Sequence, residues 1–213
     1  MLLDIKVKNQ YIITCDRDEK IRISHYPNAY NIHNFCLGHT DFVTSIEVLD
    51  ENHLISTSGD GTMKLWHFLQ GKILASVTCA EDAGLDQLKI DQADNEENIP
   101  NQLKVKRTTY LPSVLGVRIV PQESSGKVLA AVTIEKFQGF VLYEIEQNVM
   151  KFRQKVETEG PIWDFEFINS ETLVFVTAVQ GKNVQTLHIG AKEKKANVIE
   201  FSASLEDFFK GEH

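Results

Sequence analysis

"NHLISTSGDGTMKLW", residues 52–66, decides the fold because the chain contains a second copy of its pattern. Residues 10–24, QYIITCDRDEKIRIS, align with it so that Asp18 matches Asp60, 42 positions later. In both copies a short apolar run leads into a polar turn and then into alternating apolar and polar residues. This pattern is typical of a β-hairpin that buries one face.

Each hairpin has a further alternating segment on either side. LLDIKV at 2–7 and VTSIEV at 43–48 precede the two hairpins, and IHNFCL at 32–37 and KILASV at 72–77 follow them. Each unit therefore has four expected strands, and a 42-residue repeat is the length of one blade of a β-propeller. The sequence predicts an all-β propeller.

The second unit also carries a polar motif: Gly38-His39 at its entry, Ser56 in its second strand, Asp60 in the turn and Trp66 in its third strand. This motif resembles the WD-repeat family. The resemblance implies that His39, Ser56, Asp60 and Trp66 form a hydrogen-bonded chain that staples the blade. A buried polar group without a partner costs about 1–3 kcal/mol, so a structural role is expected here rather than a catalytic triad.

Two further units continue the strand pattern. The third has segments at 112–120, 127–134, 139–145 and 149–156, and the fourth has segments at 161–167, 172–179 and 183–189, with no convincing fourth strand. We expect blades at 1–37, 38–79, 103–157 and 158–190.

Residues 80–102 separate the second and third units. They contain seven acidic residues and one lysine, which indicates a solvated, disordered insertion. A short amphipathic helix over Leu85, Leu88 and Ile90 is the alternative. In the tail, 191–213, a short helix is expected, with Ser202 or Ser204 as its N-cap and Gly211 at its end.

Propellers of the WD-repeat family usually close with seven blades. We therefore expect about four blades of a seven-bladed ring, with this chain as the C-terminal half of a longer propeller. An open arc would leave a sheet face exposed at each end.

Composition excludes several functions. The formal net charge of -8 argues against the chain binding a polyanion alone, because phosphate contacts need clustered Lys and Arg. The three cysteines, Cys15, Cys36 and Cys79, lie in apolar stretches without metal-ligand spacing, so buried, reduced thiols are expected. No apolar run is long enough for a membrane helix, and no Gly-rich phosphate loop or nucleophile elbow occurs. We expect a soluble, intracellular, non-catalytic chain without cofactor, metal or small-molecule substrate.

The turn of the first unit is unusually charged. "DRDEKIRIS", residues 16–24, has six charged side chains in nine positions. One interpretation is a solvated, self-paired surface, which adds little stability. The other is a docking surface, where charge pairs supply orientation and specificity.

Together, TCDRDEKIRIS, FCLGHTDFVTSI and STSGDGTMKLW resemble the non-catalytic WD-repeat subunit of the tRNA 7-methylguanosine methyltransferase. The match is close over residues 11–66 and weaker but collinear through the tail. The resemblance implies a scaffold that forms a heterodimer with a separate S-adenosylmethionine-binding catalytic subunit and meets tRNA only through it. It also implies docking by Arg17, Glu19, Lys20 and Arg22, with Asp18 as the blade's own turn carboxylate. The expected location is the nucleus, with the cytoplasm as an additional one.

Two alternatives stay open. A general propeller adaptor, such as a ubiquitin-ligase substrate receptor or a chromatin scaffold, would hold a peptide on the central face of the ring. Direct RNA contact would have to come from one of three basic groups, for each of which a solvated or self-neutralised surface is the simpler interpretation. They are Lys104, Lys106 and Arg107; Lys151, Arg153 and Lys155; and Lys192, Lys194 and Lys195.

Overall fold

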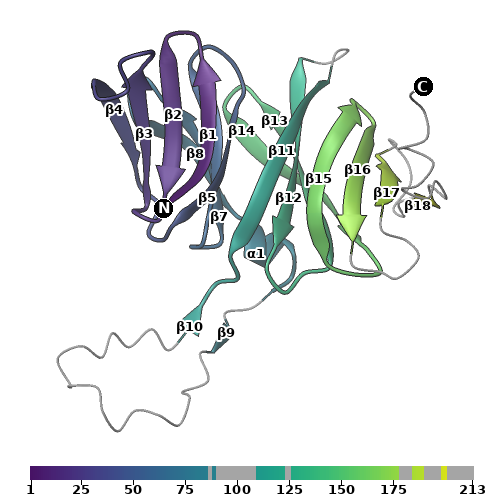
Figure 1. The fold of residues 1–213 in the computed structure, drawn as a ribbon. Helices are drawn as coiled ribbons and strands as arrows, with labels where there is room; N and C mark the ends of the chain where they lie inside the picture. The colour runs from purple at the N-terminus through teal and green to yellow at the C-terminus, as the bar shows by residue number, and fades with distance from the viewer. Residues whose placement is uncertain (86–87, 90–108, 123–125, 178–183, 190–197, 201–213) are drawn as a thin grey trace, which may run out of the picture.

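Four antiparallel sheets of four strands each stand side by side in an arc (Figure 1). This computed structural model describes residues 1–85, 88–89, 109–122, 126–177, 184–189 and 198–200. Within each sheet the strands pair in the order of the chain, as in propeller blades, which confirms the predicted fold class. Blade 1 comprises β1 (Leu2–Lys8), β2 (Tyr11–Asp16), β3 (Lys20–His25) and β4 (Ile32–Leu37). Blade 2 comprises β5 (Val43–Val48), β6 (His53–Ser58), β7 (Thr62–His67) and β8 (Lys72–Thr78).

The other two blades follow the connection after β8. Blade 3 comprises β11 (Val114–Gln122), β12 (Lys127–Ile134), β13 (Gly139–Glu146) and β14 (Val149–Glu157). Blade 4 comprises β15 (Ile162–Asn169), β16 (Thr172–Thr177), β17 (Val184–His188) and β18 (Val198–Glu200).

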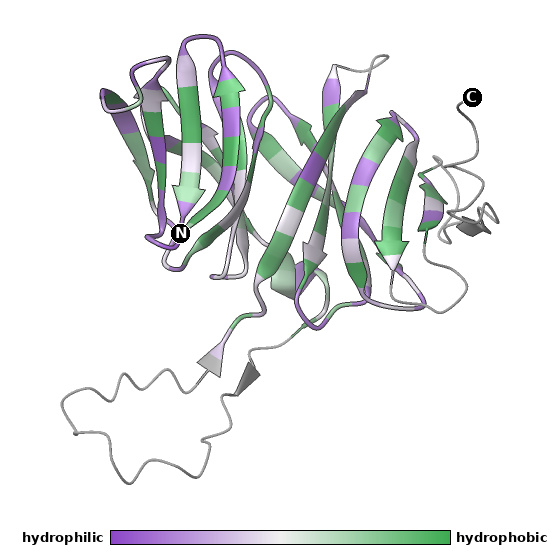
Figure 2. Cartoon of the chain, viewed as in Figure 1, coloured by the Kyte–Doolittle hydropathy of each residue, from purple (hydrophilic) through white to green (hydrophobic). Residues whose placement is uncertain are grey.

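Alternating side chains place the core between the blades rather than within them. In β2 and β3, Ile13 pairs with Ile23 and Cys15 with Ile21, and all four side chains are buried against blade 2. Figure 2 shows the resulting mixture of hydrophobic and hydrophilic bands along the strands. One apolar cluster lies between each pair of neighbouring blades, so three interblade cores hold the arc together.

The first strands of the blades, β1, β5, β11 and β15, lie next to one another along the inner side of the arc. Ion pairs link them from blade to blade. Lys6 lies 3.0 Å from Glu47, and Arg118 lies 3.6 Å from Glu47 and 3.1 Å from Glu166. Burial raises the pKa of Glu47 even though both cations favour its charged form. The inner side therefore carries a fixed row of charges across all four blades.

The arc is not closed, and the outer face of blade 1 has no neighbouring blade within the described residues. Leu2, Ile5, Val7 and Leu37 are each more than half exposed there. This agrees with the expected exposed end face of an open arc. The seven-bladed ring itself stays a prediction.

The connection between blades 2 and 3 corrects the expected insertion. The helix α1 (Cys79–Asp82) follows β8 directly. Ala83 is buried in the core between blades 2 and 3, and Ala80 is fully buried as well. The solvated segment therefore does not begin at residue 80, because two alanines are small enough to pack beneath the blades. Leu88 lies in β9 (Leu88–Lys89), which pairs with β10 (Thr109–Tyr110), so the alternative helix through Leu88 is also wrong.

Blade 4 has the fourth strand that the sequence did not indicate. Leu187 pairs with Val198 and Gln185 with Glu200, so β18 completes the sheet. The strand has three residues, too few for an alternating pattern to be recognised. The expected tail helix, from Ser202 or Ser204 to Gly211, lies outside the described residues.

Candidate docking surface

The turns and connections of interest lie along one rim of the arc. Because neighbouring strands are antiparallel, the β2–β3, β6–β7 and β12–β13 turns and the connections between blades all lie at the same edge. This is the lower edge in Figure 1, where α1 and the N-terminus lie, and we call it the lower rim. The charged turn, the Asp60 turn and α1 therefore share one side of the molecule.

The charged turn is held in a tight conformation. The amide of Asp18 donates to the Oδ1 of Asp16 over 2.8 Å, as in an Asx turn. Glu19 has a φ of 65°, in the left-handed region, and Gly61 with a φ of 79° holds the corresponding position in blade 2. A residue with a Cβ is strained there, whereas glycine is not. Arg17 and Glu19 project as exposed side chains from this turn.

Lys20 and Arg22 lie beyond the turn, on the outer face of blade 1. Thr14 pairs with Arg22, and Arg22 with Phe35, so the three side chains form a row across the sheet. The guanidinium carbon of Arg22 lies 5.8 Å from the centre of the Phe35 ring. These residues line a shallow groove of about 250 Å³, formed by Thr14, Asp16, Asp18, Lys20, Arg22, Phe35 and Leu37.

The four predicted docking side chains make no ion pair with the described part of the chain. This distinguishes Lys20 and Arg22 from Lys6, Arg118 and Arg153, each of which has a carboxylate within 4.0 Å. The charged turn therefore has no ion pairs of its own among the described residues, and a solvated surface and a docking surface both remain open for it. Among the described residues, the three cations Arg17, Lys20 and Arg22 and the carboxylate of Glu19 thus have no ion-pair partner on this edge of blade 1.

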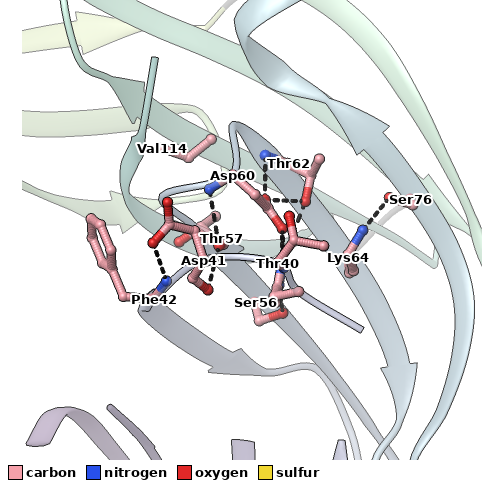
Figure 3. Close-up of polar contacts among 12 residues, drawn as sticks. Thr40, Asp41, Phe42, Ser56, Thr57, Asp60, Thr62, Lys64, Ser76 and Val114 are labelled. Carbon is pink, nitrogen blue, oxygen red and sulfur yellow. Dashed lines mark hydrogen bonds and ion pairs between the residues drawn. The ribbon is translucent and has the colours of Figure 1, made fainter. Parts of the chain in front are cut away.

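Blade 2 holds the residues of the predicted staple in one hydrogen-bonded chain. The indole of Trp66 donates to the Oγ of Ser56 over 2.8 Å, the Nε2 of His39 lies 2.7 Å from the same oxygen, and its Nδ1 lies 2.9 Å from Asp60. Around Asp60, the amide of Thr40 and the hydroxyl of Thr62 donate to the carboxylate (Figure 3). All polar atoms of this chain point at one another, so they fasten the blade and leave no free nucleophile.

The electrostatics of the staple favour an ionised Asp60. Burial by itself would raise the pKa of this carboxyl, but hydrogen bonds and attraction from His39, together with Thr62 and the Thr40 amide, outweigh burial. The pKa of Asp60 is therefore held well below its usual range.

The basic residues of β14, predicted as one of three candidate RNA contacts, mostly have partners within the chain. The guanidinium of Arg153 lies 3.8 Å from Glu144, and the ammonium of Lys155 donates to the carbonyl of Ala83 over 3.1 Å. Together with Lys151 they therefore do not form a free basic stripe. The other two basic groups, Lys104 to Arg107 and Lys192 to Lys195, lie outside the described residues.

The three cysteines are buried and free, as predicted. Burial raises the pKa of each thiol to about 12, so none is a reactive thiolate near neutral pH.

Sequence reasoning missed the polar contacts beneath α1. The hydroxyl of Tyr143 on β13 donates to Asp82 over 2.7 Å, and Lys155 on β14 reaches the end of the same helix. These contacts fix the start of the blade 2 to blade 3 connection on blade 3. The two partners are 61 positions apart in the sequence, and only the apolar spacing of Ala80 and Ala83 could have indicated that this segment packs.

Within the described residues there is no group of three or more His, Cys, Asp or Glu side chains that could hold a metal ion. Among the same residues, no helix is long and apolar enough to cross a membrane.

Solved structures with a similar fold include two computationally designed proteins. The chain matches the designed Ika4 protein with a TM-score of 0.59 at 13% identity, covering 89% of this chain and 92% of that one. It matches the designed Ika8 protein with a TM-score of 0.58 at 12% identity, covering 93% of this chain and 48% of that one. These likenesses show the fold alone.

Two relatives with printed names match about a third of the chain. A Drosophila melanogaster protein named "tRNA (guanine-N(7)-)-methyltransferase non-catalytic subunit wuho" is 52% identical over 65 residues, 30% of this chain and 15% of that protein. A Dictyostelium discoideum protein named as the wdr4 non-catalytic subunit of the same enzyme is 52% identical over 80 residues, 36% of this chain and 17% of that protein. The matched segments thus span less than a fifth of these two relatives.

A family model described as the tRNA methyltransferase TRM82 WD40 domain matches residues 1–202, nearly the whole chain. It covers the staple of blade 2, the charged turn of blade 1 and the two divergent blades alike. The resemblance seen in TCDRDEKIRIS and its neighbours is thereby confirmed, and the chain belongs to the TRM82 WD40 family.

Proposed function

We propose that the chain acts as a non-catalytic scaffold in a tRNA 7-methylguanosine methyltransferase, where it binds and stabilises a separate catalytic subunit. The family match and the names of the relatives support this proposal. The observation that carries it is the unpaired charge cluster of blade 1. A scaffold needs a specific surface for its partner rather than a reactive site, and a cluster of charges without ion-pair partners supports such a surface.

In the same proposal, the docking surface consists of Arg17 and Glu19 in the turn and Lys20 and Arg22 in the groove beside it. Lys20 and Arg22 would pair with carboxylates of the catalytic subunit. Arg22 lies beside Phe35 and Leu37, so a carboxylate that approaches it becomes partly desolvated, which strengthens the pair and fixes its geometry. The catalytic subunit would supply the methyl-donor site and the contacts to tRNA in a heterodimer, and the complex would work in the nucleus.

Co-purification after co-expression with the catalytic subunit tests this function. Arg22→Glu should abolish recovery of the complex, because it replaces attraction by repulsion at a desolvated position. Lys72→Glu is the matched control, since Lys72 is an exposed cation at the start of β8 on the opposite rim. Wild-type recovery of the complex with Arg22→Glu, with circular dichroism unchanged, would rule out this docking surface.

A further inference from the structure

Trp163 is the most anomalous side chain on the lower rim. The chain has two tryptophans, and Trp66 is fully buried whereas Trp163 is 71% exposed. Leu115, which is 51% exposed, lines the same hollow. Large apolar side chains that stay exposed in close proximity mark interaction surfaces, and tryptophan is enriched among the residues that dominate such surfaces.

Two adjoining hollows surround these residues at the junction of blades 3 and 4. The first, of about 300 Å³, is lined by Trp163, Leu115 and residues of the inner strands β1, β5, β11 and β15. The second, of about 400 Å³, shares Leu115, Thr133 and Ile162 with the first and extends to Phe137 and Pro161. Together they form one groove with an apolar wall and an exposed indole at its mouth, which we call the Trp163 groove.

Charge decides which partner fits the Trp163 groove. The carboxylates in or next to it are Asp4, Glu47, Glu135, Asp164 and Glu166, and the cations are Lys6, Arg118 and Lys136. Lys6 lies within 4.0 Å of Glu47, and Lys136 within 4.0 Å of Glu135. Arg118 lies within 4.0 Å of Glu47, Asp164 and Glu166 and is thus shared among three carboxylates. The side chains of Asp164 and Glu166 nevertheless stay 75% and 68% exposed. With five carboxylates against three cations, the groove therefore carries surplus negative charge, and Trp163 and Asp164 line the same hollow.

We propose that the Trp163 groove binds a cationic, arginine- or lysine-bearing segment of a partner protein. One basic side chain stacks on the indole of Trp163 and is held by Asp164 and Glu166, and its apolar stem packs on Leu115 and Ile162. A cation over an indole ring is the strongest of the cation–π pairs, and the neighbouring carboxylates add Coulomb attraction. The Trp163 groove is distinct from the charged turn of blade 1, which presents cations. The proposal for the groove does not depend on which partner binds the charged turn.

Titration of the complete 213-residue chain with labelled hexa-arginine, followed by fluorescence anisotropy, tests the proposal. We expect saturable binding that also changes the tryptophan emission, because Trp66 is shielded and Trp163 is the ring that meets the peptide. Trp163→Ala should weaken binding about fivefold to tenfold, and Trp163→Phe should weaken it less. The double variant Asp164→Asn, Glu166→Gln should weaken binding and reduce its salt dependence.

Matched variants separate a built site from general attraction to an acidic protein. Tyr30→Ala removes a ring that is 85% exposed on the opposite rim, and Glu51→Gln removes an exposed carboxylate there, so both should bind hexa-arginine like the wild type. The proposal is overturned if Trp163→Ala retains wild-type affinity, if Tyr30→Ala loses as much affinity as Trp163→Ala, or if hexa-serine binds as well as hexa-arginine. Trp163→Phe guards against misfolding, since it keeps the apolar volume.

Discussion

The indole nitrogen of Trp66 lies 2.8 Å from the hydroxyl oxygen of Ser56, and the same oxygen lies 2.7 Å from the Nε2 of His39. One hydroxyl thus satisfies two buried ring nitrogens. Ser56→Ala leaves both rings in place but removes their common partner. Because each buried polar group without a partner costs about 1–3 kcal/mol, we expect the free energy of unfolding to fall by about 2–4 kcal/mol. Urea denaturation measures the change.

Ser76→Ala is the matched control for that substitution. The Ser76 hydroxyl is exposed on β8 and accepts a hydrogen bond from Lys64, so its loss should change stability by less than about 0.5 kcal/mol. Equal effects of the two substitutions would show that the staple contributes no more than a surface contact.

Asp60 gives the blade an acid-sensitive contact. Its pKa is depressed in the folded chain relative to about 3.9 in the unfolded chain, so its contribution is present above pH 4 and is lost as pH falls through the folded pKa. We expect Asp60→Asn to be less stable than the wild type at neutral pH, with a difference that shrinks below about pH 4. Glu47 acts in the opposite direction because its pKa is raised, so the difference between wild type and variant, measured by urea denaturation at each pH, isolates Asp60. A difference that does not depend on pH would contradict the assignment.

The hydrogen bond between Tyr143 and Asp82 should hold α1 on blade 3. Tyr143→Phe keeps the buried ring and removes only the hydroxyl. We expect a loss of about 1–3 kcal/mol and faster amide hydrogen exchange at Ala83 and Leu85, whose amides donate to carbonyls within this segment. Exchange in β6, in the centre of blade 2, should be unaffected. Faster exchange throughout the chain would instead indicate global loosening of the fold.

The fold could be predicted from the sequence where its strands leave a local pattern in the order of residues. The strands of blades 1 and 2 follow from short alternating segments and from the 42-residue match between Asp18 and Asp60, whereas blade 3 was predicted from the number and spacing of its strand-like segments. The three-residue β18 is too short for such a signal, and its place beside β17 depends on pairing across an intervening segment. The packing of α1 was also missed, because the acidic composition of residues 80–102 conceals two buried alanines at its start.

The clustering of the predicted docking residues could be seen in the sequence, but whether they form ion pairs could not. Sequence shows that Arg17, Glu19, Lys20 and Arg22 crowd together, but the β-strand register decides which neighbours each side chain meets. Arg22 meets Thr14 and Phe35 rather than a carboxylate, and this leaves its charge available. In the sequence, Trp163 looks like an ordinary strand residue. Its exposure could not be predicted, because a register irregularity between Ile162 and Asp164 interrupts the alternation of the strand there.

The three cysteine thiols should be unreactive in the folded chain. Burial raises the pKa of Cys15, Cys36 and Cys79 to about 12, so at pH 8 the thiolate fraction is negligible. We expect a thiol-specific disulfide reagent to modify none of them in native buffer and all three after denaturation. Rapid modification of one thiol under native conditions would mean that its blade interface opens.

Glu19 separates the stability of the charged turn from its proposed docking role. Its φ of 65° is strained for a residue with a Cβ, and Gly61 occupies the same place in blade 2. Glu19→Gly and Glu19→Ala both remove the carboxylate, but only glycine removes the strain. We expect Glu19→Gly to be more stable than Glu19→Ala by about 1 kcal/mol in thermal unfolding, a difference limited by the greater unfolded-state entropy of glycine. If Glu19 contacts the catalytic subunit, both variants should weaken the complex equally in a pull-down titration, whatever their stability. A complex whose strength instead follows the stability order of the two variants would show that Glu19 acts only through the shape of the turn.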